Sequence, residues 1–197
     1  MNRKSTVGII IIGSIVGVIA VIGLIFGTWW ISTSNRINNR YQDCEQQWSQ
    51  VENVMQRRAD LIPNLTAAVK GSMTQEQKVF GEIAKARQAY SSANTPAEKM
   101  KADTKLNQST GMLINVIHEK YPKLESDQRV ADLMTQLEGS ENRIAVERQN
   151  YINDVRAYNQ LIINFPSSMV ANARNKHTLH YYQADKTAQH APKVDLQ

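Results

Sequence analysis

The chain opens with a hydrophobic run that differs from everything after it. Residues 7–31 are 25 consecutive positions without a charged side chain. As an α-helix they would extend about 37 Å, which exceeds the ~30 Å hydrocarbon core of a bilayer. The pattern therefore predicts a transmembrane helix over residues 7–31, preceded by a short basic N-terminus at residues 1–6.

A cleaved signal peptide is the alternative for this run, with Arg3 and Lys4 as its basic n-region. Against it, the run is longer than the usual h-region of about 7–15 residues, and no small-x-small site closes it cleanly. The run also ends in Trp29 and Trp30, whose amphipathic rings suit the lipid–water boundary. We therefore expect an uncleaved single-pass anchor in the cell membrane.

The charges on either side of the anchor give a small preference for its orientation. Arg3, Lys4 and the α-amino group precede it, whereas Arg36 and Arg40 follow it. Because an excess of positive charge marks the cytoplasmic side, this difference favours a helical domain on the outer, periplasmic side.

Beyond the anchor, apolar residues recur every three or four positions, which is the helical period. The first such series predicts one helix that continues directly from the anchor: Ile37, Tyr41, Cys44, Trp48, Val51 and Met55. Pro63 lacks an amide donor, so we expect a kink or break there. The same period then continues to about Tyr90.

Two further helices follow a loop at residues 91–96. Thr95 is a candidate N-cap, with Pro96 at the first helical position of a helix that ends at Lys120 before Tyr121-Pro122. The last helix has apolar residues seven apart, with Glu141 and Arg148 in the same seam and Phe165-Pro166 at its end. The seven-residue series is Val130, Leu137, Ile144, Tyr151, Tyr158 and Phe165.

Long helices joined by short loops favour an antiparallel bundle. The sequence thus predicts an all-α protein: an N-terminal transmembrane helix, then an antiparallel bundle of about four long helices over residues 35–182. Residues 183–197 are polar and irregular, and we expect them to be disordered.

Composition adds little that points to catalysis or nucleic acid. The net charge is +5, but the bases are interspersed with acids and form no Lys/Arg block, so we expect no nucleic-acid partner. Serine-hydrolase, phosphate-loop and zinc-protease motifs are absent, and Cys44 lies in an apolar seam. His177 and His180 have no fixed third ligand. We expect no catalytic residue, metal, cofactor or small-molecule substrate.

Two features are candidates for interaction. Small residues four apart in the anchor, Gly13 with Gly17 and Gly23 with Gly27, would let two helices approach closely, although glycine is common in membrane helices generally.

The second feature surrounds the proline, in residues 57–65 (RRADLIPNL). Two guanidinium groups and a carboxylate there suggest a local ion-pair network, and the polar side chains are suited to bonding the backbone groups that the proline leaves unpaired. It is either a docking surface or, as we favour, a structural staple at a helix kink. Its residues are Arg57, Arg58, Asp60, Pro63 and Asn64.

These same stretches resemble the hallmarks of the LemA family of bacterial membrane proteins, over nearly the whole chain. The first hallmark is residues 57–65, with Trp48, Val51 and residues 69–71; the second is residues 137–145 with Arg148; the third is Tyr158-Asn159 with Phe165-Pro166. Residues 84–87 and 181–184 are also similar.

The chain departs from the family pattern at two places. Tyr151-Ile152 replaces a usual Tyr-Asn, and Arg174-Asn175-Lys176 replaces a usual Gly-Phe turn, which puts in doubt how the tail folds back. The resemblance implies a single-pass membrane protein with an antiparallel helical bundle and no known catalytic residues. It also implies a role beside membrane proteases and other envelope proteins.

Three functions follow. The first is a non-enzymatic module, anchored in the bilayer, that forms homo-oligomers and scaffolds or shapes the bacterial envelope. The second is an adaptor that docks onto a membrane protease or another envelope protein through residues 57–64. The third, least supported, is an enzyme, which would need a pocket with converging titratable groups.

Overall fold

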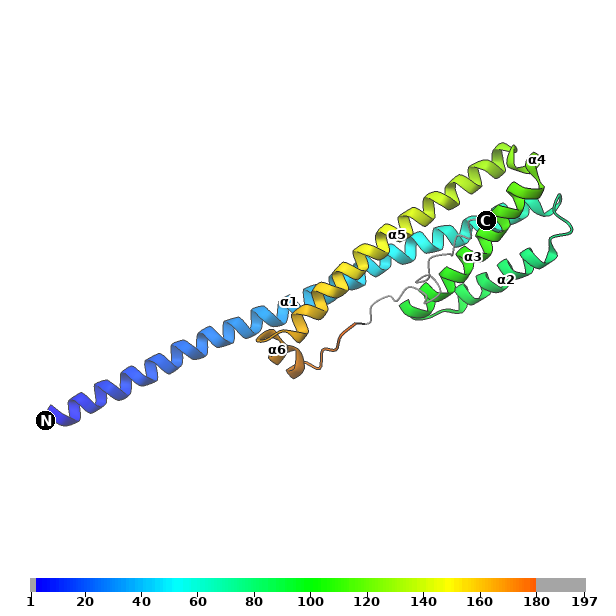
Figure 1. Ribbon diagram of the computed structural model, residues 1–197. Coiled ribbons are helices and arrows are strands. Elements are labelled where there is room, and N and C mark those ends of the chain that lie inside the picture. The colour runs from blue at the N-terminus through cyan, green and yellow to red at the C-terminus, as the bar shows by residue number, and fades with distance from the viewer. Residues whose placement is uncertain (1–2, 180–197) are drawn as a thin grey trace, which may run out of the picture. The chain divides into compact units, whose positions relative to one another are not determined.

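The computed structural model describes the backbone of residues 3–179 and the side chains of residues 12–179. This part of the chain contains six helices and no strand (Figure 1). They are α1 (Arg3–Lys70), α2 (Gln77–Ser92), α3 (Pro96–Lys120), α4 (Pro122–Glu125), α5 (Gln128–Ile163) and α6 (Ser167–Ala173). The predicted all-α class is confirmed, as is the bundle region that follows an apolar N-terminal helix.

Helix α1 carries the apolar run and continues without interruption into the first helix of the bundle region. Its large apolar side chains between Ile12 and Ile31 are exposed, because no described part of the chain packs against them. Among the described residues, α1 alone is long and apolar enough to cross a membrane; a signal sequence would also meet this criterion. The helix therefore fits a single-pass membrane protein.

Of the kink or break expected at Pro63, the break is wrong, because α1 runs through the proline and ends at Lys70. A proline inside a helix costs about 3 kcal/mol. Ile62, Leu65 and Val69 lie beside it with no exposed surface, and each such burial contributes about 1.5–3 kcal/mol. Packing thus outweighs the cost of the proline. The chain instead turns at residues 71–76, before α2.

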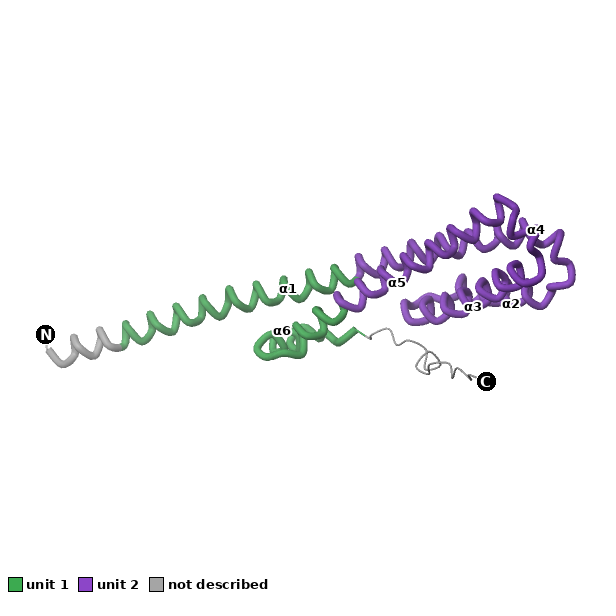
Figure 2. Tube along the Cα trace, turned by 45° about the horizontal axis from the view of Figure 1, so that its top comes forward, with its two compact units in different colours: residues 1–44, 155–179 green, residues 45–154, 180–197 purple. Residues whose placement is uncertain are grey.

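The helices form two compact units (Figure 2): residues 1–44 with 155–179, called the membrane-proximal unit, and residues 45–154, called the bundle unit. Within the bundle unit, α1 and α5 are antiparallel: Gln47 donates to Glu147 over 2.7 Å, whereas Arg57, further along α1, lies with Gln136, earlier in α5. Helix α3 runs parallel to α1, because Lys99 pairs with Glu52 over 2.6 Å and Asn107 accepts from Arg58.

Helix α3 begins at the predicted cap. Glu98 N–H donates to Thr95 Oγ1 over 3.2 Å, and the Glu98 carboxylate accepts from the backbone N–H groups of Thr95 and Asn94 over 3.2 and 3.1 Å. This reciprocal capping box satisfies amide groups that the first helical turn leaves without partners. Both predicted ends of the helix, at Pro96 and Lys120, are confirmed.

The membrane-proximal unit joins α1 to the end of α5 and to α6. Tyr41 and Tyr158 pack edge-to-face with ring centroids 5.7 Å apart, and the seven-residue series from Val130 to Tyr158 is buried as predicted. Phe165 is a correction: its side chain is 81 % exposed. Helix α5 ends at Ile163, so the helical spacing no longer determines where Phe165 points.

The chain after α6 folds back through a left-handed residue. Asn175 has φ 51°, which asparagine tolerates better than most residues that carry a Cβ. The N–H of Lys176 donates to Ala171 O over 3.0 Å, and its Nζ lies 5.2 Å from the centre of the Tyr41 ring. Asn175 thus forms a turn within residues 174–176, the stretch that departs from the Gly-Phe pattern of the resemblance.

The buried side chain of Asn159 then holds the backbone of Leu179. Its Nδ2 donates to Leu179 O over 2.8 Å, and its Oδ1 accepts from Leu179 N over 2.9 Å. The chain is therefore docked up to Leu179. His180 and the tail at 183–197, predicted to be disordered, lie outside the described residues.

The capping box makes stability depend on pH. Backbone hydrogen bonds from Asn94 and Thr95 hold the pKa of Glu98 below its ordinary value of 4.5. A lowered pKa contributes stability that is present above about pH 4.5 and is lost as the pH falls through the pKa of the folded state. Glu98→Gln should therefore unfold at lower urea concentration than the wild type at pH 7, with the difference vanishing in acid.

Circular dichroism of the full chain in detergent measures this effect. Glu138→Gln is the control, because exposed Glu138 makes no ion pair or hydrogen bond with another described side chain. An equal loss of stability in Glu98→Gln at all pH values would contradict the role assigned to the Glu98 carboxylate.

Candidate functional site

Three charged side chains meet in the interior of the bundle unit, one from each of α1, α3 and α5. Arg58 and Asp103 are 3 % and 0 % exposed and form an ion pair. Arg148, 20 % exposed, pairs with the other carboxylate oxygen of Asp103, at 2.5 Å from Nη2 to Oδ2. We call these three residues the Arg–Asp–Arg cluster.

Hydrogen bonds extend the cluster to the surface. Arg58 donates from Nη1 to Asn107 Oδ1 over 2.9 Å and from Nη2 to the backbone oxygen of Asp103 over 3.2 Å. Asn107 in turn donates from Nδ2 to Glu141 Oε1 over 2.7 Å. A continuous chain of polar contacts therefore joins the three helices and ends at an exposed carboxylate.

The local sequence explains why these charges are inside. Arg58 stands between Met55 and Ile62 at the helical spacing that buries both neighbours, and Asp103 stands in the same way between Met100 and Leu106. An apolar residue is expected at each position. Two charges of opposite sign thus occupy core positions on different helices, where each is the partner that makes burial of the other tolerable.

Burial dominates the electrostatics of the cluster. Desolvation raises the pKa of Asp103, while the guanidinium groups of Arg58 and Arg148 oppose the rise. Tyr90, at the end of α2, is also buried, and desolvation together with the negative charges of Asp103 and Glu52 raises the pKa of its hydroxyl far above the ordinary value. The phenol remains protonated at every physiological pH.

These properties are those of a structural contact. The two arginines are engaged with one carboxylate, and a guanidinium is not deprotonated in proteins, so it provides no general base. No group of three histidine, cysteine or acidic residues within the described part of the chain is placed to hold a metal ion.

The predicted residues around Pro63 are divided between core and surface. Arg57, Asp60 and Asn64 are exposed, Pro63 is half-buried and Arg58 is buried. The expected local ion-pair network is not what forms: Asp60 accepts a hydrogen bond from Gln56 Nε2 over 2.8 Å, and Arg58 turns inward to Asp103. A helix places neighbours 100° apart, so adjacent arginines face different environments.

Arg57 lies instead in a shallow groove between α1 and α5, called the two-arginine groove. It brings residues 57–65 and 137–145 together, although they are far apart in the sequence. The hydroxyl of Ser140 donates to Gln136 O over 2.8 Å. The charged groups of the lining are the guanidinium groups of Arg57 and Arg143. The lining is Gln50, Asn53, Val54, Arg57, Gln136, Gly139, Ser140 and Arg143.

The anchor glycines are spatially open. A Cβ added at Gly13, Gly17, Gly23 or Gly27 would meet no atom within 4 Å outside the helix's own backbone. At 100° per residue Gly13, Gly17 and Gly27 fall on one side of α1, with Ala20 between them. We call the side of α1 formed by Gly13, Gly17, Ala20 and Gly27 the glycine face. The described part of the chain does not cover it.

The sequence analysis missed Asp103, and it named Asn159 only as part of a family hallmark, without its role in holding Leu179. A signal for Asp103 was present, because a lone carboxylate at an apolar seam position needs a buried cation, and Arg148 occupied a seam position of α5. Asn159 carried no comparable signal, since its partner is the backbone of Leu179, twenty residues later.

The cluster generates a prediction that separates two adjacent arginines. Arg58→Ala leaves Asp103 buried beside Arg148 alone, and loss of one partner of a buried pair typically costs about 3–5 kcal/mol. Arg57→Ala, at the exposed neighbouring position, should change the free energy of unfolding by less than about 0.5 kcal/mol. Urea unfolding of the full chain in detergent measures both.

A triple replacement is the second arm of this experiment. Arg58→Met with Asp103→Leu and Arg148→Met removes all the buried charges and should restore most of the stability lost in Arg58→Ala. Equal stability of the two single variants would show that the cluster is not the contact described here.

One comparison with known proteins identifies the family of this chain. A search of curated proteins found no match. The sequence profile described as the LemA family matches residues 47–196, a range that includes the Arg–Asp–Arg cluster, the two-arginine groove and Asn159. The chain belongs to the LemA family.

Proposed function

We propose that this protein is a non-enzymatic scaffold of the bacterial envelope, anchored by α1 and assembled laterally into homo-oligomers. The observation that carries the proposal is the open glycine face, on a helix whose large apolar side chains are exposed from Ile12 to Ile31. A surface of this kind is suited to contact with lipid and with a second helix.

The physical argument concerns packing in lipid. Apolar helices gain little from mutual burial in a bilayer, so association depends on close packing, which small residues four apart permit. Confinement in the membrane also raises the effective concentration of neighbouring copies, so weak contacts suffice for assembly.

The bundle unit supports a structural role over a catalytic one. Its buried charges are engaged with each other, the buried hydroxyls of Ser109, Thr110 and Ser140 are bonded to backbone oxygens, and apolar side chains such as Leu106 and Ile144 fill much of the interior. An interior of this kind favours a rigid spacer over a site that binds and releases a substrate.

For orientation, we propose that the helical domain lies on the outer side. Arg3, Lys4 and the α-amino group carry one positive charge more than Arg36 and Arg40, which directs the N-terminus to the cytoplasm. Protection of an N-terminal tag, with protease access to the domain in intact spheroplasts, tests this orientation.

The glycine face gives a direct test of assembly. Gly17→Leu with Gly27→Leu adds bulk where helices would meet, and we expect association weakened by at least about tenfold, equivalent to about 1.4 kcal/mol. Val18→Leu with Ile22→Leu, on the opposite side of α1, is the matched control and should assemble normally. Particle mass in native-lipid nanodiscs measures the copy number, and a wild type that is monomeric at every density refutes the proposal.

The two-arginine groove favours a second function, that of an adaptor for another envelope protein such as a membrane protease. Two exposed guanidinium groups flanked by amides suit an acidic segment of a partner. A photocrosslinker at Arg57 or Arg143 should then capture one dominant foreign protein, and Arg57→Glu with Arg143→Glu should abolish capture at a nearby unmodified position. Recovery of self-crosslinks alone favours the scaffold.

A further inference from the structure

The membrane-proximal unit has apolar side chains on its surface at a place where its core is already complete. Ile163, Phe165 and Met169 are 60 %, 81 % and 48 % exposed, whereas Ile162 and Val170 beside them are buried. All three exposed residues belong to the end of α5, the turn after it, or the start of α6. We call them the apolar turn.

The apolar turn lies close to the end of the apolar run of α1. The two helices are antiparallel and meet at Tyr41 and Tyr158, so Ile163, the last residue of α5 and five residues beyond Tyr158, corresponds to Arg36, five residues before Tyr41. Phe165 lies in the turn that follows Ile163. Ser34, two residues before Arg36, is buried, and Figures 1 and 2 both show α6 beside α1.

That level falls at the outer edge of the boundary zone of a bilayer. Arg36 is five residues beyond Ile31, or about 7.5 Å along a helix. The polar boundary on each side of the hydrocarbon core is about 5–7 Å thick. The exposed apolar side chains therefore stand beside the headgroup boundary, if α1 spans the bilayer at its apolar run.

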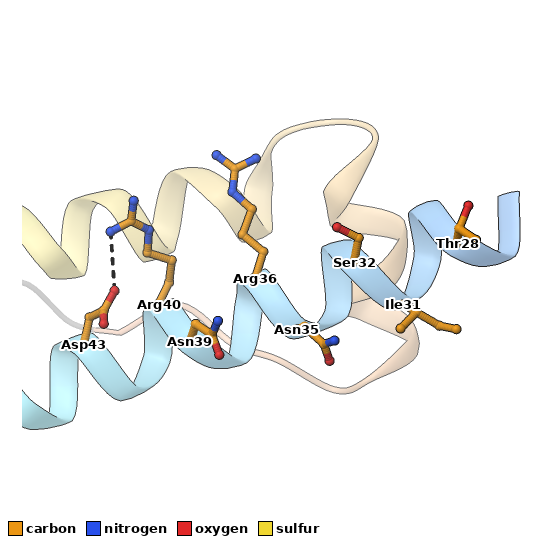
Figure 3. A pocket seen from close by; sticks show the side chains of 8 residues that line it. All are labelled: Thr28, Ile31, Ser32, Asn35, Arg36, Asn39, Arg40 and Asp43. Atoms are coloured by element: carbon orange, nitrogen blue, oxygen red, sulfur yellow. Dashed lines mark hydrogen bonds and ion pairs between the residues drawn. The ribbon is translucent and has the colours of Figure 1, made fainter. Parts of the chain in front are cut away.

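The unit that carries the apolar turn is basic. Arg36 and Arg40 project from one side of α1, with Arg40 held by Asp43 at 3.4 Å (Figure 3). Within residues 32–44 and 155–179 the basic side chains outnumber the acidic ones, and Asp43 is the only acidic residue there. The bases are Arg36, Arg40, Arg156, Arg174 and Lys176. Positive charge beside exposed apolar residues is the chemistry of a surface that binds anionic lipid headgroups.

We propose that the apolar turn is a second membrane contact, in which Ile163, Phe165 and Met169 enter the headgroup boundary of the leaflet that α1 crosses. The apolar run that ends nearby, the level of the turn and the basic character of the unit all favour lipid over another protein as the occupant. Together with α1, this contact fixes how the membrane-proximal unit is tilted and rotated against the bilayer.

The test places an environment-sensitive fluorophore on the turn of the full chain. Cys44 is the only cysteine and is buried, so Phe165→Cys or Met169→Cys introduces the accessible thiol. In vesicles of phosphatidylcholine and phosphatidylglycerol, a label at either position should emit at shorter wavelength. Lipids with a quencher near the headgroup should quench it several-fold more strongly than the control label.

Val146→Cys is the control, because Val146 is an exposed apolar residue of α5 seventeen positions before Ile163. Water-like emission at both test positions overturns the proposal. A blue shift without quenching by lipid, together with crosslinks between position 165 of two copies, also overturns it, because another chain then covers the turn.

The inference rests on the membrane anchor proposed above. A carbonate wash of the vesicles distinguishes failure of the anchor from failure of the second membrane contact. Loss of the protein from vesicles removes the anchor and the scaffold proposal with it. Retention of the protein, with a label at position 165 that lipid does not quench, removes the second contact alone.

Discussion

The Arg–Asp–Arg cluster is the constraint on which the bundle unit depends. Apolar side chains at three- and four-residue spacing pack in more than one register, because a shift by one heptad exchanges similar residues. A buried carboxylate has no such freedom: Asp103 must face both Arg58 and Arg148, or remain as an unpaired charge in a medium that solvates it poorly. The cluster therefore fixes how α1, α3 and α5 are aligned, and this alignment forms the two-arginine groove on the surface.

Features that depend on a few adjacent residues could be predicted from the sequence. The N-cap at Thr95 needs only the residues beside it, and the heptad series of α5 needs only its own spacing, so the cap and the burial of the series from Val130 to Tyr158 were predicted correctly. A break at Pro63 was mispredicted because the residues that stabilise a continuous α1 act through tertiary packing. Phe165 was mispredicted because the periodicity was extended two residues beyond the end of its helix. Asp103 and Asn159 depend on partners far along the chain, which a single sequence does not identify.

The family hallmarks acquire physical roles from these contacts. Arg58 and Arg148 come from two different hallmarks and meet on one carboxylate, and Asn159 of the third hallmark holds the returning chain at Leu179. Arg57 and Arg143 lie on the outside of the same helices and take part in no ion pair among the described residues. The hallmarks thus combine residues that hold the fold with residues that remain available to a partner.

The positions of the three tryptophans have a practical consequence. Trp29 and Trp30 are at the end of the apolar run, beside Phe26, whereas Trp48 packs on Tyr151 in the bundle unit with ring centroids 5.6 Å apart. The intrinsic emission of the native protein is therefore a sum of two reporters. Denaturant that melts the helices beyond the apolar run acts on Trp48, whereas Trp29 and Trp30 report on the surroundings of the apolar run, so one unmodified sample carries both signals.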